Sequence, residues 1–210
     1  MNRILEPELM IDIDQCQAFD QAHSRQRELA CLQLLFKLCT PKGVAIDVGC
    51  GSGTYADLLK QKFVFERIDA IDGSACMIDL AKHKYGHQRD INWINQTLAT
   101  VKNRYDFIFC MDSLHHMPTL DTLFASRIMT TGTEIFVMDH VRPNGVDQAR
   151  DLVNKFAMID NQTYRDDFFN SLCAAYTKTE VTSYLAIKHP GLRVKIVGRD
   201  LKFIVIYGKV

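Results

Sequence analysis

Three glycines and one carboxylate stand close together near residue 50, with the spacing of a nucleotide-binding loop. A short apolar strand sequence contains Asp47, and Gly49, Gly51 and Gly53 follow it at alternate positions before a predicted helix. A strand, a glycine loop and a helix in this order form a nucleotide pocket at the carboxyl edge of an α/β sheet. A dinucleotide fingerprint needs a glycine three residues after its second one, where this chain has Thr54. The carboxylate of Asp47 would repel a pyrophosphate, but it suits the ammonium group of an amino-acid-like ligand.

A second carboxylate follows at the end of the next predicted strand. The run Arg-Ile-Asp-Ala-Ile-Asp ends at Asp72, nineteen residues after Gly53. A carboxylate at that place can accept hydrogen bonds from both hydroxyls of a ribose. The segment continues as Gly73-Ser74-Ala-Cys-Met77, in which Ser74 is a suitable N-cap for a helix. The alternative is that both turns bind no ligand and that Met77 lies in the core.

These motifs resemble those of the class I S-adenosylmethionine-dependent methyltransferases, and the resemblance covers roughly residues 40–210. In that family an Asp-x-Ser-x-x-Met segment places the acid at the ribose and the methionine near the adenine. The resemblance implies S-adenosyl-L-methionine as the cofactor and S-adenosyl-L-homocysteine as the product. The cofactor-binding residues that it implies are Asp47, Gly49, Cys50, Gly51, Gly53, Asp72, Gly73, Ser74, Met77, Gln96, Thr97, Met111 and Asp112. Thr97 stands where the family commonly has an acid for the adenine amino group, so Gln96 or Asn95 is expected to offer a side-chain amide there, together with backbone groups.

The residues expected to face the transferred methyl group follow two later strands. His115-His116 comes shortly after the predicted fourth strand, and Asp139-His140 comes at the end of the fifth. Ligands of an open α/β sheet bind outside the carboxyl ends of the strands, where the strand order reverses. We therefore predict His115, His116 and His140 as catalytic residues, with His115 or His140 as a general base. Alternatively, the His-His pair only hydrogen-bonds the backbone, or the acceptor is nucleophilic enough for orientation alone to suffice.

Two helical segments are expected to cover this edge of the sheet. The resemblance implies that residues 1–40 form an N-terminal helical lid and that residues 140–189 form a helical insert, or second lid, after the fifth strand. The polar and aromatic residues that we predict to bind substrate are Tyr164, Arg165, Asn170 and Tyr176. Thr177 and Glu180 have the spacing of a capping box, which predicts a helix start. The alternative is that the aromatic residues of the insert simply pack it onto the sheet.

The predicted fold is α/β, with a Rossmann-like seven-stranded sheet that is mostly parallel, an antiparallel C-terminal hairpin and helices on both faces. The hairpin is predicted because only three residues separate the last two strand-like runs. The strands are expected over 44–48, 67–72, 91–94, 106–111, 134–139, 194–197 and 201–207. The main helices are expected over 15–39, 55–62, 74–85 and from 120 to just before Gly132. Residues 1–210 are expected to form a single methyltransferase domain.

Composition agrees with one globular domain. The chain has 210 residues, of which 47% are hydrophobic, and 25 basic residues balance 25 acidic ones. This balance provides no field that would attract nucleic acid or an anionic membrane. Seven cysteines without a Cys-x-x-Cys pair predict reduced thiols in a cytoplasmic protein and no metal site. We see neither a signal segment nor an apolar run of about 18 residues, so no membrane association is expected.

We interpret the chain as a methyltransferase that acts on the N, O or S atom of a small molecule. The alternatives are an RNA or protein methyltransferase and a cofactor-binding partner subunit without catalysis. Neither Asn-Pro-Pro-Tyr nor Asp-Pro-Pro-Tyr follows the fourth strand, which disfavours enzymes of the exocyclic-amine and glutamine types. The acceptor, the use of a base and the oligomeric state stay open at this point.

Overall fold

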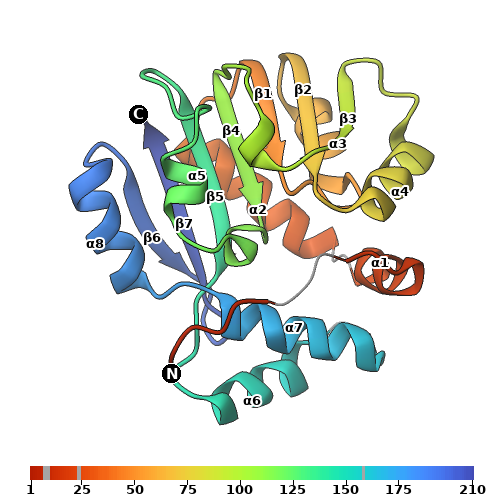
Figure 1. Cartoon of the computed structure of the whole chain (residues 1–210), viewed down its shortest axis with the longest axis vertical. Helices are drawn as coiled ribbons and strands as arrows, with labels where there is room; N and C mark the ends of the chain where they lie inside the picture. The colour runs from red at the N-terminus through yellow and green to blue at the C-terminus, as the bar shows by residue number, and fades with distance from the viewer. Residues whose placement is uncertain (7–9, 23–24, 158) are drawn as a thin grey trace.

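A seven-stranded sheet forms the centre of the molecule (Figure 1). The computed structural model describes residues 1–6, 10–22, 25–157 and 159–210. The sheet has the order β3-β2-β1-β4-β5-β7-β6, and β7 pairs antiparallel with both β5 and β6 whereas the other pairs are parallel. The strands are β1 (Gly43–Val48), β2 (Phe65–Asp72), β3 (Ile91–Asn95), β4 (Phe107–Met111), β5 (Glu134–His140), β6 (Arg193–Val197) and β7 (Phe203–Lys209). This confirms the predicted fold class.

Helices cover both faces of the sheet, as the alternation of side chains along its strands requires. In β4, Phe107 and Phe109 pack in one apolar layer, whereas Ile108 and Cys110 pack in the other. The first layer contains residues of α2 (Arg25–Leu38), α3 (Thr54–Lys62) and α4 (Ala75–Tyr85). The second contains residues of α5 (Asp121–Phe124) and α8 (Lys178–Lys188). Every residue of β4 and β5 is buried, which explains the continuous apolar run of β4 and of the middle of β5.

Three helices lie at the carboxyl end of the parallel strands rather than on a face of the sheet. Figure 1 shows α6 (Val146–Phe156) and α7 (Gln162–Ala174) below the tip of β4, with α1 (Ile13–Gln21) beside them. Helices α6 and α7 share a small apolar cluster of their own that includes Val153, Phe168 and Leu172. The strand order reverses between β1 and β4, above these helices. The fold therefore places a helical layer over the edge where ligands of such sheets bind.

Two predicted helices differ from the structure. The single helix expected over 15–39 is divided into α1 and α2, and residues 23 and 24 between them lie outside the described residues. The two parts serve different surfaces, since α2 packs on the sheet and α1 contacts α7 and α4. The helix expected from residue 120 is the one-turn α5, although the apolar residues that predicted it, such as Leu123 and Ile128, are fully buried. Periodicity identified the buried positions there but not the length of the helix.

Local signals at helix starts were accurate. The Ser74 side chain accepts a hydrogen bond from the Met77 amide at the start of α4, as predicted. Thr177 and Glu180 form the predicted capping box at α8. Within the ranges that the structure describes, no helix is both long and apolar enough to cross a bilayer.

Candidate active site

The glycine loop is held against β2 in a conformation that glycine favours. Gly49, Gly51 and Gly53 all have positive φ angles, of 71°, 53° and 86°. The amides of Gly49 and Cys50 both donate to the carbonyl of Ile71, at 2.9 and 3.0 Å. A β-carbon on Gly49 would lie 1.9 Å from the Ser113 hydroxyl. The loop therefore packs directly against the segment that follows β4.

Asp47 brings a buried carboxylate to the floor of this loop. Its side chain is buried, and its Oδ2 atom has no hydrogen-bond partner among the residues that the structure describes. Burial, and then the neighbouring charge of Asp72, raise the pKa of Asp47 to about 8. An orphaned buried carboxylate oxygen is costly in a folded protein. A cationic ligand group beside it would remove that cost, so the site fits an ammonium group.

The carboxylate of Asp72 is fixed by the backbone on both sides. Its Oδ2 accepts a hydrogen bond from the Gly51 amide at 2.9 Å, and its Oδ1 accepts one from the Ser74 amide at 2.8 Å. Burial raises the pKa of Asp72, and these two hydrogen bonds act in the opposite direction. Each carboxylate oxygen keeps a second lone pair. Asp72 can therefore accept two further hydrogen bonds, as from a pair of vicinal hydroxyls.

Most of the predicted cofactor residues line one cavity of about 810 Å³, its open mouth included. This first pocket lies between the glycine loop, the end of β2 and the segment after β4. The predicted residues in its wall are Asp47, Gly49, Cys50, Gly51, Asp72, Gly73, Ser74, Met77, Met111, Asp112 and His116. The wall also contains four residues that were not predicted, Met10, Phe19, Tyr55 and Ser113. Of these, Tyr55 and Ser113 directly follow predicted motifs, whereas Met10 and Phe19 reach the pocket only through the tertiary fold.

Three of the predicted cofactor residues lie outside this wall. The backbone of Gly53 caps α3 and packs against Trp93, to which an added β-carbon would come within 2.7 Å. The backbone amide of Gln96 donates to the Asp72 carbonyl at 2.9 Å, and Thr97 is exposed. The neighbouring Asn95 side chain donates to the carbonyls of Asp72 and Gly73. The end of β3 and the residue after it thus support the loop at Asp72 and Gly73.

A second pocket of about 710 Å³ adjoins the first and is lined both by the edge of the sheet and by α6 and α7. Met10, Phe19, Asp112 and His116 line both pockets, so the two meet at these residues. The remaining lining residues come from α2, the ends of β5 and η2 (Leu114–His116), α6, α7 and the segment before β7. They are Arg27, His115, His140, Phe156, Tyr164, Asp167, Phe168, Ser171 and Leu201.

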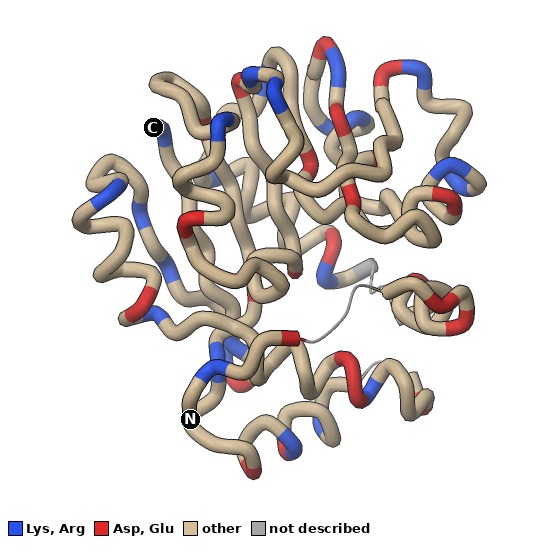
Figure 2. Tube along the Cα trace, viewed as in Figure 1, with Lys and Arg blue, Asp and Glu red and all other residues tan. Residues whose placement is uncertain are grey.

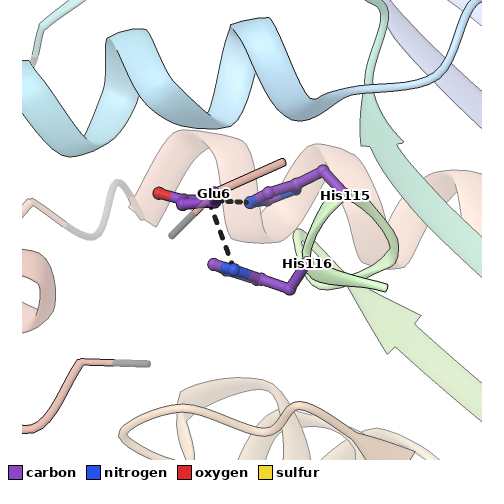
Figure 3. A group of neighbouring side chains, drawn as sticks. All are labelled: Glu6, His115 and His116. Atoms are coloured by element: carbon purple, nitrogen blue, oxygen red, sulfur yellow. Dashed lines mark ion pairs between the residues drawn. The ribbon is translucent and has the colours of Figure 1, made fainter. Parts of the chain in front are cut away.

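Carboxylates hold the histidine pair after β4 from two sides, and Figure 3 shows the one that belongs to Glu6. Nδ1 of His115 lies 2.8 and 3.0 Å from the two carboxylate oxygens of Asp139, which also accepts the His115 amide at 2.8 Å. Oε2 of Glu6 lies 3.4 Å from His115 Nε2 and 3.2 Å from His116 Nδ1. Burial opposes a charge on His115, but Asp139 and Glu6 outweigh it and raise the pKa of His115 to about 10. Burial and the charge of His115 lower the pKa of His116 to about 4.

His140 and Asp112 form the facing wall. His140 is buried, its Nδ1 has no hydrogen-bond partner within the described part of the chain, and its Nε2 lies 3.9 Å from Asp112 Oδ1. Burial lowers the pKa of His140 to about 4, so its ring is neutral near pH 7. Asp112 pairs with Arg27 and has a φ of 49°, a strained conformation for a residue other than glycine. Neither Glu6, which reaches the histidine pair, nor Arg27, which reaches Asp112, was among the predicted site residues, because each comes from a distant segment.

The four predicted substrate residues lie in different places. Tyr164 lines the second pocket. Arg165 hydrogen-bonds Asn154 at 2.6 Å on the exposed side of α6 and α7, and Asn170 lines neither pocket. The Tyr176 hydroxyl donates to the Met117 carbonyl at 2.9 Å, and the Arg3 guanidinium lies 3.9 Å from the centre of its ring. The geometry therefore brings only Tyr164 of this set to the site.

Sequence comparison gives partial matches to known methyltransferases. Residues 45–130 match a family model described as a methyltransferase domain. Malonyl-[acyl-carrier protein] O-methyltransferase 1 of Ilyobacter polytropus is 32% identical over 66 residues, which cover 30% of this chain and 25% of that protein. Ubiquinone biosynthesis O-methyltransferase of Coxiella burnetii is 34% identical over 77 residues, which cover 35% of this chain and 32% of that protein. The chain thus matches about a quarter to a third of the length of these curated relatives.

Solved structures share the fold over nearly the whole chain. The plantazolicin methyltransferase BpumL, solved with a triazolic desmethylPZN analog and SAH, has a TM-score of 0.67 at 15% identity and covers 93% of this chain and 90% of its own. A SAM-dependent methyltransferase from Aquifex aeolicus has a TM-score of 0.65 at 17% identity, and the match covers 95% of this chain and 100% of that chain. The motifs, the sequence match and the shared fold agree: residues 45–130 are similar to a methyltransferase domain, and the chain has the fold of S-adenosylmethionine-dependent methyltransferases.

Proposed function

We propose that this protein transfers the methyl group of S-adenosyl-L-methionine to an N, O or S atom of a small molecule bound in the second pocket. The observation that carries the proposal is the pair of carboxylates across the glycine loop, of which Asp47 is buried and Asp72 half-buried. Asp47 offers an orphaned oxygen for an ammonium group, and Asp72 offers two lone pairs for vicinal hydroxyls. S-Adenosylmethionine presents both groups, and when bound it supplies a methyl group activated by a positively charged sulfur. S-Adenosyl-L-homocysteine is then the product.

The acceptor side of the proposal follows from how the two pockets join. His116 and Asp112 line both pockets, so an acceptor in the second pocket meets the cofactor at these residues. The wall around it combines aromatic side chains such as Phe168 with a few polar groups, which is typical of small-molecule sites. His140 is neutral and its Nδ1 is without a partner in the described structure, so it can accept a hydrogen bond from an acceptor hydroxyl or amine. Held in line, two reactants gain about 7–11 kcal/mol from orientation alone.

The helical segments around the pockets support a role as lids. Met10 and Phe19, within residues 1–40, line both pockets. Asp20 of α1 hydrogen-bonds Ser52 of the glycine loop and pairs with Lys84 of α4. Within residues 140–189, α7 contributes Tyr164 and Phe168 to the second pocket. In this proposal both segments close over the acceptor and exclude water during methyl transfer.

A small acceptor is favoured over a macromolecule by the charge distribution as well as by the enclosing helices. Figure 2 shows Lys and Arg interspersed with Asp and Glu along the trace. The formal net charge of the chain is zero. Proteins that bind a large RNA usually carry a stripe of Lys and Arg side chains on their surface.

The test is a screen of small amines, thiols, phenols and carboxylic acids for release of S-adenosylhomocysteine. Mass spectrometry of each acceptor shows whether it has gained one methyl group. Asp72→Ala is the matched control, because it weakens cofactor binding without altering the second pocket. We expect product formation with one acceptor class and little with the control variant. Labelling of RNA or protein instead of every small acceptor, or no transfer by a protein that binds the cofactor, would contradict the proposal.

A further inference from the structure

Three potential metal ligands meet where the cofactor pocket and the acceptor pocket join. Glu6 comes from the N-terminal segment, and His115 and His116 come from the turn after β4. One ligand atom of each residue lies within 4.8 Å of the others. The Glu6 oxygen is 3.4 Å from His115 Nε2 and 3.2 Å from His116 Nδ1. Two ligands bound at 2.0–2.1 Å to one tetrahedral zinc ion lie about 3.3 Å apart.

The hydrogen bonds of His115 leave the required nitrogen free. Asp139 accepts the Nδ1 proton of His115, so in the neutral ring the Nε2 atom carries a lone pair that faces Glu6. That Nε2 atom is buried and has no hydrogen-bond partner among the described residues. A carboxylate that holds the far side of a ligating histidine is the usual support of a protein zinc ion. Asp139 occupies that position here.

The charges around the cluster also call for a cation. The Glu6 and Asp139 side chains are 6% and 2% exposed, so two carboxylates flank the His115 ring away from solvent. The nearby Arg3 directs its guanidinium to backbone carbonyls, including those of His115 and Met117. These bonds hold the N-terminal segment in place, and with it Glu6. A proton on His115 is one way to balance the two carboxylates, and a bound metal ion is the other.

We propose that Glu6, His115 and His116 bind a divalent transition-metal ion, with Zn²⁺ as the best match, beside the acceptor. Two imidazoles favour zinc and its neighbours over magnesium or calcium, which prefer oxygen ligands. His115 and His116 both line the second pocket, so the open coordination position faces the acceptor. This role rests on the proposed function. An acceptor hydroxyl or thiol bound to the ion would lose its proton to water, and its oxygen or sulfur would then form the bond to the methyl group as the carbon–sulfonium bond breaks.

The site is tested on the full-length protein after removal of metal with a chelator. Calorimetric titration with Zn²⁺ should give one site per chain, and Co²⁺ should give the visible absorption of a four-coordinate nitrogen and oxygen site. Glu6→Gln keeps the side-chain size, and we expect it to weaken binding at least tenfold, as should His116→Ala. His87→Gln is the matched control, since His87 is exposed and distant from the cluster. Each variant is first checked for an unchanged thermal unfolding temperature in the absence of metal.

The outcomes separate this inference from the proposed function. If Glu6→Gln and His116→Ala bind Zn²⁺ as tightly as the wild type, or if the wild type binds none, the metal site is refuted and a proton balances the cluster. Sulfur charge-transfer bands in the Co²⁺ spectrum would place the ion on cysteines and also refute it. Binding of S-adenosylhomocysteine is measured separately. A protein that does not bind S-adenosylhomocysteine would contradict the proposed function, but a metal site measured on the same protein would still stand.

Discussion

Asp47→Asn removes one ionisable group from the cofactor pocket and preserves its shape. In the free protein the pKa of Asp47 is raised to about 8 by burial and by Asp72, so the carboxyl is mostly protonated at pH 6 to 7. An ammonium group needs the ionised form as its partner. Cofactor binding should therefore release a proton from Asp47, and the affinity of the wild type should rise with pH until it levels off above about 8.

The size of this effect follows from the pKa. Each pH unit below the pKa costs about 1.4 kcal/mol to ionise the group. The wild-type Kd for S-adenosylhomocysteine should therefore fall about tenfold between pH 6 and 7, and by less between pH 7 and 8. At pH 8.5 the variant lacks a charge-assisted hydrogen bond worth about 1.5–3 kcal/mol, so it should bind roughly 10- to 100-fold more weakly. Near pH 6 the Kd values of the two proteins for S-adenosylhomocysteine should differ much less.

The same pKa has a consequence for the stability of the free protein. The folded state keeps a proton on Asp47 that the unfolded chain, with a pKa of about 3.9, loses at lower pH. The free energy of unfolding of the wild type therefore decreases through this group as pH rises from about 4 to 8. Asp47→Asn removes that decrease, and the variant should unfold at a higher temperature than the wild type above pH 8.

Calorimetry between pH 6 and 9, repeated in two buffers of different ionisation enthalpy, measures both the affinity and the released proton. Asp72 is present in both proteins, so the difference between them measures the ionisation of Asp47 together with its coupling to Asp72. Two results would exclude ionised Asp47 as the partner of the ammonium group. One is the same dependence of Kd on pH in both proteins, and the other is binding of S-adenosylhomocysteine by Asp47→Asn as tight as that of the wild type at pH 8.5.

Three further changes test other parts of the account. Asp72→Ala should weaken S-adenosylhomocysteine binding by about 2–3 kcal/mol in calorimetry, because it removes charged hydrogen bonds; an unchanged Kd would exclude it from the ribose site. Gly53→Ala should lower stability by about 1–3 kcal/mol in thermal unfolding, since φ is 86° and the new β-carbon would lie 2.7 Å from Trp93; an unaltered melting temperature would contradict this. His140→Ala should reduce turnover at least tenfold in steady-state kinetics and change cofactor affinity only a few-fold; full turnover would exclude His140 from the acceptor wall.

Local sequence signals predicted the sheet and most of the lining of the first pocket because both are encoded in short segments. The apolar runs of β1 and β4 and the glycines between residues 49 and 53 are contiguous, and the ends of parallel strands meet at one edge. The separation of the hairpin strands likewise predicted the antiparallel β6–β7 pair. Such features need no knowledge of long-range contacts.

The acceptor side was less predictable because distant segments build it. Glu6 contacts the His115-His116 pair across more than half of the chain, and Arg27 reaches Asp112 from α2. Phe19 fitted the apolar pattern of a core helix, yet it lines both pockets because α1 separates from α2. Tyr176 is a polar aromatic residue of the kind expected to bind substrate. In the structure it instead contacts Met117 and Arg3, and so helps to anchor the N-terminal segment. No local pattern distinguishes these roles.

The central claim is that the paired carboxylates of the first pocket recognise S-adenosylmethionine and its product. Titration of the wild-type protein with S-adenosylhomocysteine at pH 8, beside a parallel titration with a nicotinamide dinucleotide, tests it most directly. We expect one site per chain with a micromolar Kd for S-adenosylhomocysteine and no measurable heat from the dinucleotide. Absence of S-adenosylhomocysteine binding, or tight binding of the dinucleotide, would contradict the claim.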